Sequence, residues 1–248
     1  MGRFSLCDII KQSKSLTTLN LSGNGFDGFD TSAIAEAIKQ SQSLATVNLQ
    51  DNSIGTYGAV VLAKAIAQSK SLTAVNLRGN SIGVFGASMI AGAIAQSGLV
   101  RELDLSYNQI GSKGLAALFA AKSLITLNLS GNSIGDVDAV AIAAIIRQST
   151  RLTALFLNDN LIGDVGAFAI ADAIQQSASL AKLMLSVNQI GDRGAVAISD
   201  AIQQSKSLIA VSLIANAIGP TGVSAIARAF KTKARPHHTT KKNKQSFF

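Results

Sequence analysis

The chain has 248 residues, 48% of them hydrophobic, a length that suits one large domain or two small ones. Its formal net charge is +8, but six of the 22 Lys and Arg residues lie in residues 231–248, which contain no acidic residue. The remainder of the chain is close to neutral, which argues against a folded body that binds nucleic acid.

The first 14 residues resemble the second half of a helix that returns later in the chain. The stretch "LCDIIKQSK" (6–14) matches "LAKAIAQSK" (62–70). We therefore expect residues 1–14 to be a partial N-terminal repeat that consists of the half of a unit that carries the helix.

One pattern recurs eight times from residue 15 onward. "SLTTLNLSGNGF" at 15 returns as "SLATVNLQDNSI" at 43, and the spacing is 28 residues except between the fourth and fifth units, where it is 24. Each unit carries L-x-x-L-x-L-x-x-N-x-I or a close variant, the pattern of a leucine-rich repeat. The predicted repeats are residues 15–42, 43–70, 71–98, 99–122, 123–150, 151–178, 179–206 and 207–230.

Each unit predicts a strand followed by a helix. Stretches such as "GAVVLAKAIAQS" (58–69) place apolar residues at i, i+3, i+4 and i+7, which is typical of an amphipathic helix. Parallel strands lie about 4.8 Å apart, whereas helices need roughly 8–10 Å, so the stack must curve. We predict an α/β fold, a right-handed solenoid or horseshoe with a parallel β-sheet on the concave side and α-helices on the convex side.

Four sequence features carry expectations about the turns. The Asn of each unit should satisfy backbone groups of adjacent turns, and the Gly that follows it in seven units, as at Gly55, should adopt a backbone shape closed to other residues. Asp136, Asp164 and Asp192, just before three successive helices, suit the helix dipole. The fourth unit lacks four residues, so its helix should be short, with Phe119 filling the gap.

The first unit also contains Gly23, Gly25 and Gly28 after an apolar stretch, in the order of a dinucleotide-binding fingerprint. Seven sibling units make the same strand-to-helix passage without these glycines, so the fingerprint is a coincidence and we expect no cofactor. Asp27 and Asp30 stand where the second unit has glycines, which predicts a looser loop.

The 28-residue period and the phrase NxIGxxGAxxIAxAI resemble the ribonuclease-inhibitor-like class of leucine-rich repeats. That class includes ribonuclease inhibitor, the repeat domains of innate-immune receptors and the Ran GTPase-activating protein, and similar arrays occur in bacterial effectors. The resemblance implies a scaffold that binds proteins. It leaves two alternatives: a regulator of a small GTPase, or a repeat fragment of a larger receptor or effector. Against the first, no catalytic motif of the GTPase-activating proteins matches the residues around Arg78.

A partner is expected on the concave face, because alternate strand residues point outward there. Most of these positions hold small neutral residues. Two groups depart from them. Arg78, Glu102, Asp104 and Tyr107 form a mixed-charge aromatic patch on the third and fourth strands, and an apolar patch on the sixth to eighth strands is either a contact surface or covered by the C-terminal tail. The candidate partner-binding residues are Arg78, Glu102, Asp104, Tyr107, Phe156, Asn158, Met184 and Ile214.

Catalysis has little support in the sequence. The two histidines, His237 and His238, are adjacent in the segment 231–248, so no Ser-His-Asp set is available in the repeats. Cys7 is the single cysteine, which fits a reducing compartment, and we expect a cytoplasmic location, in a host cell if the protein is a secreted effector. Residues 231–248 should be a disordered basic tail, able to attract nucleic acid or an anionic membrane.

Overall fold

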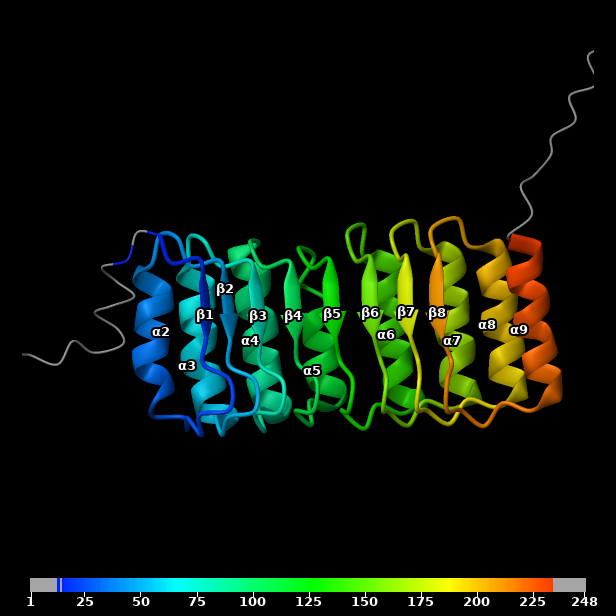
Figure 1. Cartoon of the computed structure of the whole chain (residues 1–248), viewed down its shortest axis with the longest axis horizontal. Helices are drawn as coiled ribbons and strands as arrows, with labels where there is room; N and C mark the ends of the chain where they lie inside the picture. The colour runs from blue at the N-terminus through cyan, green and yellow to red at the C-terminus, as the bar shows by residue number, and fades with distance from the viewer. Residues whose placement is uncertain (1–12, 14, 234–248) are drawn as a thin grey trace, which may run out of the picture.

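The computed structural model describes residue 13 and residues 15–233, so the expected partial repeat at 1–14 and most of the segment 231–248 lie outside the described residues. Each repeat contributes one strand and one helix to a single stack (Figure 1). The strands are β1 (Thr18–Asn20), β2 (Thr46–Asn48), β3 (Ala74–Asn76), β4 (Glu102–Asp104), β5 (Thr126–Asn128), β6 (Ala154–Phe156), β7 (Lys182–Met184) and β8 (Ala210–Ser212). The helices are α2 (Thr31–Gln40), α3 (Gly55–Gln68), α4 (Gly83–Ser97), α5 (Gly111–Leu118), α6 (Asp136–Gln148), α7 (Asp164–Gln176), α8 (Asp192–Gln204) and α9 (Pro220–Lys233).

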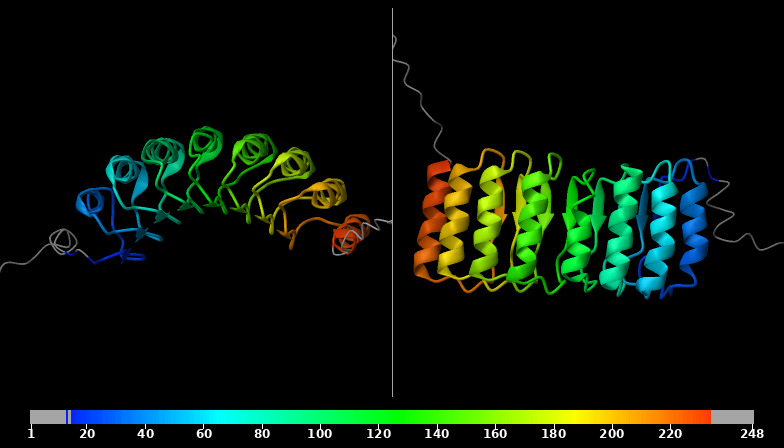
Figure 2. Two further views of the ribbon diagram at one scale, coloured as in Figure 1. Left: turned by 90° about the horizontal axis from the view of Figure 1, so that it is seen from above. Right: turned by 180° about the vertical axis from the view of Figure 1, so that it is seen from behind.

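The strands form one parallel sheet in the order β1 to β8, in which each strand pairs with the strand of the next repeat. The register follows the repeat spacing, so that Leu19 pairs with Val47 and, across the shorter fourth unit, Leu103 pairs with Leu127. Seen from above, the stack is an arc with the strands on its inner side and the helices on its outer side (Figure 2). The predicted α/β solenoid is confirmed.

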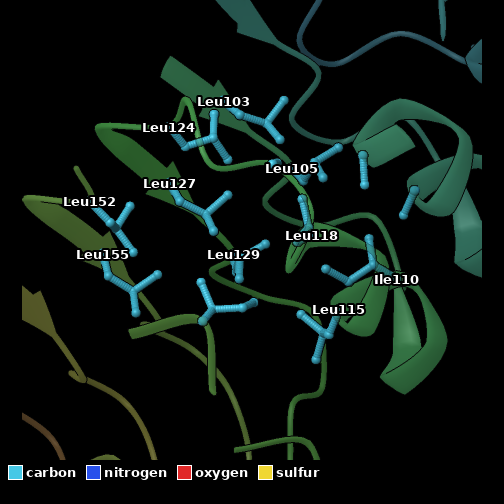
Figure 3. Close-up of a cluster of buried hydrophobic side chains, with 14 of the residues drawn as sticks. Leu103, Leu105, Ile110, Leu115, Leu118, Leu124, Leu127, Leu129, Leu152 and Leu155 are labelled. Carbon is cyan, nitrogen blue, oxygen red and sulfur yellow. The ribbon is translucent and has the colours of Figure 1, made fainter. Parts of the chain in front are cut away.

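The core lies between the sheet and the helices and runs without a break along the stack. In the fourth repeat, Leu103 and Leu105 point from the strand side toward Leu115 and Leu118 of α5 (Figure 3). All four side chains are buried, with at most 2% of their surface exposed. Because every unit offers the same apolar positions, stacking buries a continuous core that one unit alone could not form.

The repeated Asn ties each turn to its neighbours, as the sequence predicts. The Nδ2 group of Asn108 donates to the carbonyl oxygens of Leu77 (2.8 Å) and Ser106 (2.9 Å). Its Oδ1 accepts from the backbone N–H groups of Asn80 (3.0 Å) and Ile82 (3.2 Å). One side chain therefore binds four backbone groups, and it supplies the acceptor for the N–H groups of Asn80 and Ile82, which have no other acceptor among the described residues.

The Gly after each Asn has two different roles, which corrects the expectation of one special backbone shape. Gly55, Gly83 and Gly111 have φ of +61°, +68° and +54°, a region that favours glycine. Gly135, Gly163 and Gly191 instead have extended φ of −102°, −97° and −95°. At Gly163 a Cβ would lie 3.2 Å from the Asp136 carboxylate, so there the glycine makes room for a neighbouring side chain.

The Asp136 carboxylate links two consecutive repeats. Asp136 begins α6, and its Oδ1 accepts from the N–H groups of Gly163 (2.7 Å) and Gly166 (2.8 Å), at the start of α7. The same pair of bonds recurs from Asp164 and Asp192 to the start of the following helix. These aspartates therefore suit the dipole of their own helix and also satisfy N–H groups at the start of the next one.

Two repeats depart from the common form. Helix α2 begins at Thr31, four residues later than α3 does in the next repeat, and the Asp27 carboxylate accepts from the N–H groups of Phe29 (2.8 Å) and Asp30 (3.1 Å). The first loop is thus irregular, as its two aspartates indicate, and the Asp27 carboxylate bridges its backbone. Helix α5 has only 8 residues, as predicted, and Phe119 packs against the core there, leaving a hollow of about 10 Å³.

Candidate functional site

The concave face presents two rows of side chains from the eight strands. The central residue of each of β1 to β7 points into the core, as Val47 does, and the two residues that flank it point outward. Most of the outward residues are Thr, Ala, Asn or Ser. The exceptions are Glu102, Asp104, Phe156, Lys182 and Met184.

A shallow hollow of about 410 Å³ lies on this face, over strands β2 to β6. Glu102 and Asp104 of β4 line it near its middle, and Phe156 of β6 lines one side. The rest of the lining consists of Thr, Asn, Ala and the inward residues of the strands. The curvature of the stack creates this hollow, because the strands are its inner side (Figure 2).

The two carboxylates in the hollow differ in their hydrogen bonding. Asp104 accepts hydrogen bonds from Asn128 Nδ2 (2.8 Å) and from the backbone N–H of Ser106 (2.8 Å), so its position is fixed. Within residues 13 and 15–233, the Glu102 carboxylate has no hydrogen-bond or ion-pair partner. Glu102 is exposed, and it is the group in the hollow that is free to pair with a ligand.

Phe156 contacts a cation that the sequence reasoning missed. The Nζ of Lys182, on β7, lies 5.0 Å from the centre of the Phe156 ring. Met184, on the same strand, is the register partner of Phe156. Lys182 occupies the row of Glu102, in which the other positions are Thr or Ala, and this departure is the signal that identifies it.

Arg78 and Tyr107 lie at the ends of strands β3 and β4, outside the hollow. The Arg78 guanidinium carbon is 4.2 Å from the centre of the Tyr107 ring, and the Tyr107 hydroxyl donates to Asp159 Oδ2 (2.9 Å). The hydrogen bond to Asp159, followed by partial burial, raises the pKa of Tyr107 above 10.0. Sequence reasoning missed Asp159, although it is the residue equivalent to Tyr107 two repeats later.

Asn158 and Ile214 are separate from both groups. The Oδ1 of Asn158 accepts from the backbone N–H of Ser186 (3.0 Å), which ties its amide to the next repeat. Ile214 follows β8 at the end of the stack and is 74% exposed. The structure thus brings Glu102, Asp104 and Phe156 together, with Met184 beside them, and it places the other candidates apart from the hollow.

Two further features of the described residues concern membrane spans and metal binding. No helix among them is both long and apolar enough to cross a bilayer. In residues 13 and 15–233, no three His, Cys, Asp or Glu side chains form a group able to hold a metal ion.

Solved structures share this architecture at low sequence identity. The leucine-rich repeat-containing protein LegL7 from Legionella pneumophila is 16% identical, with a TM-score of 0.56 over 93% of this chain and 86% of that one. The tropomodulin C-terminal domain from Caenorhabditis elegans is 15% identical, with a TM-score of 0.50 over 59% of this chain and 92% of that one. No curated protein matches the sequence. At these identities the likeness concerns the fold.

Family models match most of the repeats directly. The Leucine Rich repeat model matches residues 40–63, 68–91, 99–119, 120–143, 148–171 and 176–199, and a second Leucine Rich Repeat model matches residues 15–37. Proteins of this family are in general non-enzymatic scaffolds, and the fold here supports a repeat scaffold that binds protein. The chain belongs to the leucine-rich repeat family.

Proposed function

We propose that the chain is a non-enzymatic scaffold that binds a protein partner through its concave face, with Glu102 at the centre of the contact. The observation that carries the proposal is the unpaired Glu102 carboxylate in a hollow of about 410 Å³. A carboxylate held there by a strand, with Asp104 as its one charged neighbour among the described residues that line the hollow, suits a Lys or Arg side chain of a partner.

The surroundings of Glu102 suit a protein surface better than a small ligand. Phe156 and Met184 supply apolar contact area beside the charged centre, and aromatic and Met side chains are enriched at protein interfaces. Lys182 and Arg78 place positive charge on either side of the acidic centre. A partner with one basic side chain between apolar and acidic neighbours would complement this pattern. Tyr107, Asp104, Asn158 and Ile214 complete the proposed contact set.

A capture experiment with matched carboxylate variants tests this function. Immobilised wild-type protein, Glu102→Gln and Asp200→Asn are exposed to the same extract, and recovered proteins are quantified by mass spectrometry. Asp200 is an exposed carboxylate on convex helix α8 and serves as the control. We expect a partner that wild type and Asp200→Asn retain and that binds Glu102→Gln about tenfold more weakly. Equal recovery by all three proteins would refute concave-face binding at Glu102.

A second pair of variants tests the apolar part of the site. Phe156→Ala/Met184→Ala should weaken the same partner, while Val137→Ala/Val140→Ala on convex helix α6 should not. Thermal unfolding of each variant shows whether a lost contact reflects a lost fold. An unchanged dissociation constant for the concave pair would remove Phe156 and Met184 from the proposal.

The GTPase-regulator alternative is tested separately. Arg78, the arginine on this face, stacks on Tyr107. Accelerated GTP hydrolysis by a panel of small GTPases, lost in Arg78→Ala, would favour that alternative over the scaffold. We also propose a cytoplasmic location, on the basis of the single cysteine.

A further inference from the structure

The last repeat leaves part of its core uncovered. Five of its apolar residues are exposed or half-buried, although their equivalents in the preceding repeat, Leu183, Leu185, Ile190, Ala195 and Ile202, are at most 2% exposed. We call these five residues the C-terminal end face. They are Val211, Leu213, Ile218, Val223 and Phe230.

The same end carries a free strand edge. In the preceding repeat, Leu185 and Val187 donate their backbone N–H groups to the carbonyl oxygens of Ser212 and Ile214, both at 2.8 Å. The equivalent N–H groups of Leu213 and Ala215 have no acceptor in the part of the chain that the structure describes. Since β8 is the last strand of the sheet order, it offers a template for one further strand.

The charged side chains that belong to the last repeat and to the residues after it have one sign. Asp200 is the last acidic residue of the sequence, and residues 201–248 contain eight Lys or Arg residues. Lys206, Arg228 and Lys231 are exposed, and none has an ion-pair partner among residues 13 and 15–233. Val223, Ala227 and Lys231 follow one another at intervals of four residues along α9, which places Lys231 on the side of the helix that carries Val223 of the end face.

We propose that the C-terminal end face binds an extended acidic segment of a partner protein, which adds to β8 as a ninth strand. The free N–H groups supply main-chain hydrogen bonds, the exposed apolar side chains receive alternate residues of the segment, and the basic rim attracts its carboxylates. This site is distinct from the concave hollow and does not depend on the function proposed there.

Charge and packing select this occupant over others. A second copy docked end to end by a two-fold axis, or residues 234–248 of the same chain, would bring further basic residues against Lys206 and Lys231. A ninth repeat of the same type would need a close helix approach, like that of Gly222, where a Cβ would lie 2.9 Å from Ala195 Cβ. Val223 stands at the position of Ala195 and is bulkier. An anionic membrane would leave the strand edge unpaired.

The test uses the full chain and synthetic peptides. The probe is a fluorescent ten-residue peptide that alternates Val with Glu, and the two control peptides carry Lys in place of Glu or contain the same residues in scrambled order. Fluorescence anisotropy should show saturable binding of the acidic alternating peptide and at least tenfold weaker binding of both controls. No saturable binding, or equal binding of the scrambled peptide, would overturn the proposal.

Protein variants locate the binding site. Lys231→Glu and Val223→Glu change exposed side chains at the end face, and we expect each to weaken the peptide at least tenfold. Lys64→Glu, an exposed Lys on α3, is the matched control and should leave affinity unchanged. Thermal unfolding verifies that all three variants are folded. Equal weakening by Lys64→Glu would show a general charge effect and contradict the assignment.

Hydrogen exchange and two further measurements distinguish the other occupants. The amides around Leu213 and Ala215 should exchange rapidly in the free protein and slowly with the acidic peptide bound. Protection already present without peptide would mean that the chain itself covers the edge. A doubled mass in light scattering that Val223→Glu abolishes would identify a second copy, and binding to phosphatidylserine vesicles that Lys231→Glu abolishes would identify a membrane. Each of these three results would overturn the proposal.

Discussion

The hydroxyl of Tyr107 donates a hydrogen bond of 2.9 Å to Asp159, across the repeat that lies between them. The ring passes over Gly131, where a Cβ would come within 2.5 Å of ring atoms, so the glycine gives the ring its path. Tyr107 itself has φ of +57°, and the Arg78 guanidinium lies against its ring. Three residues from different repeats thus fix one aromatic side chain on the rim of the concave face.

The contact with Asp159 predicts a raised pKa for the Tyr107 hydroxyl, which a titration can measure. Tyr57→Phe leaves Tyr107 as the single tyrosine, whose ionisation is followed by absorbance near 295 nm in a chain without Trp. The hydrogen bond to Asp159 raises the pKa of Tyr107 above 10.0, so the midpoint should exceed 10.0 and should fall when Asp159→Asn is added. Because the folded pKa is raised, the contribution to stability is complete below pH 10 and is lost as pH rises through the folded pKa. Identical midpoints with and without the Asp159→Asn substitution would contradict the assigned cause.

The repeated Asn predicts unequal effects of one substitution. Asn108→Ala leaves the buried N–H groups of Asn80 and Ile82 without an acceptor, and each such group costs about 1–3 kcal/mol. Asn24, in the same motif position, is exposed, and its side chain makes one bond within the described part of the chain, to the carbonyl of Ser22. We expect Asn108→Ala to lower the free energy of unfolding by at least about 2 kcal/mol in urea titrations. Asn24→Ala should lower it by less than about 1 kcal/mol, and equal losses would refute this account.

The inter-repeat aspartates predict a loss of helix capping. Asp164→Ala removes the acceptor for the N–H groups of Gly191 and Gly194 at the start of α8. Loss of a capping side chain costs about 1–2 kcal/mol. The unfolding midpoint should fall accordingly, and it should hardly change in Asp200→Ala, since that carboxylate is exposed and accepts no such bond. A midpoint for Asp164→Ala equal to that of the control would show that the helix start does not need the carboxylate.

The scaffold could be predicted from the sequence because all eight units place apolar residues at the same positions. Eight copies of the same apolar spacing define strand, helix, register and curvature, and even the short fourth unit with Phe119 follows from a four-residue deletion. The two glycine turns could not be separated, because the difference depends on a carboxylate of the preceding repeat that reaches across to the next turn.

The candidate site was only partly predictable for a related reason. The residues that differ from their repeat neighbours could be found, which gave Glu102, Asp104 and Phe156. Which of these side chains contact one another depends on the curvature of the sheet and on the length of side chains that extend to a neighbouring repeat. The cation–π contact of Lys182 with Phe156 and the hydrogen bond of Tyr107 to Asp159 both join side chains of different repeats. The uncovered last repeat also needed the structure, since its apolar residues look like ordinary core positions in the sequence.

Val187 predicts a gain in stability. It occupies the strand-end position at which every repeat has φ between +54° and +67°, and its own φ is +56°. A β-branched residue is strained in this left-handed region by about 1–3 kcal/mol, whereas glycine adopts it freely. Val187→Gly should therefore raise the free energy of unfolding by about 1 kcal/mol after the greater chain entropy of glycine is subtracted. Val187→Ala, which removes the branch and keeps Cβ, should give a smaller gain. A urea midpoint that falls in Val187→Gly would mean that the half-exposed side chain makes contacts worth more than the strain.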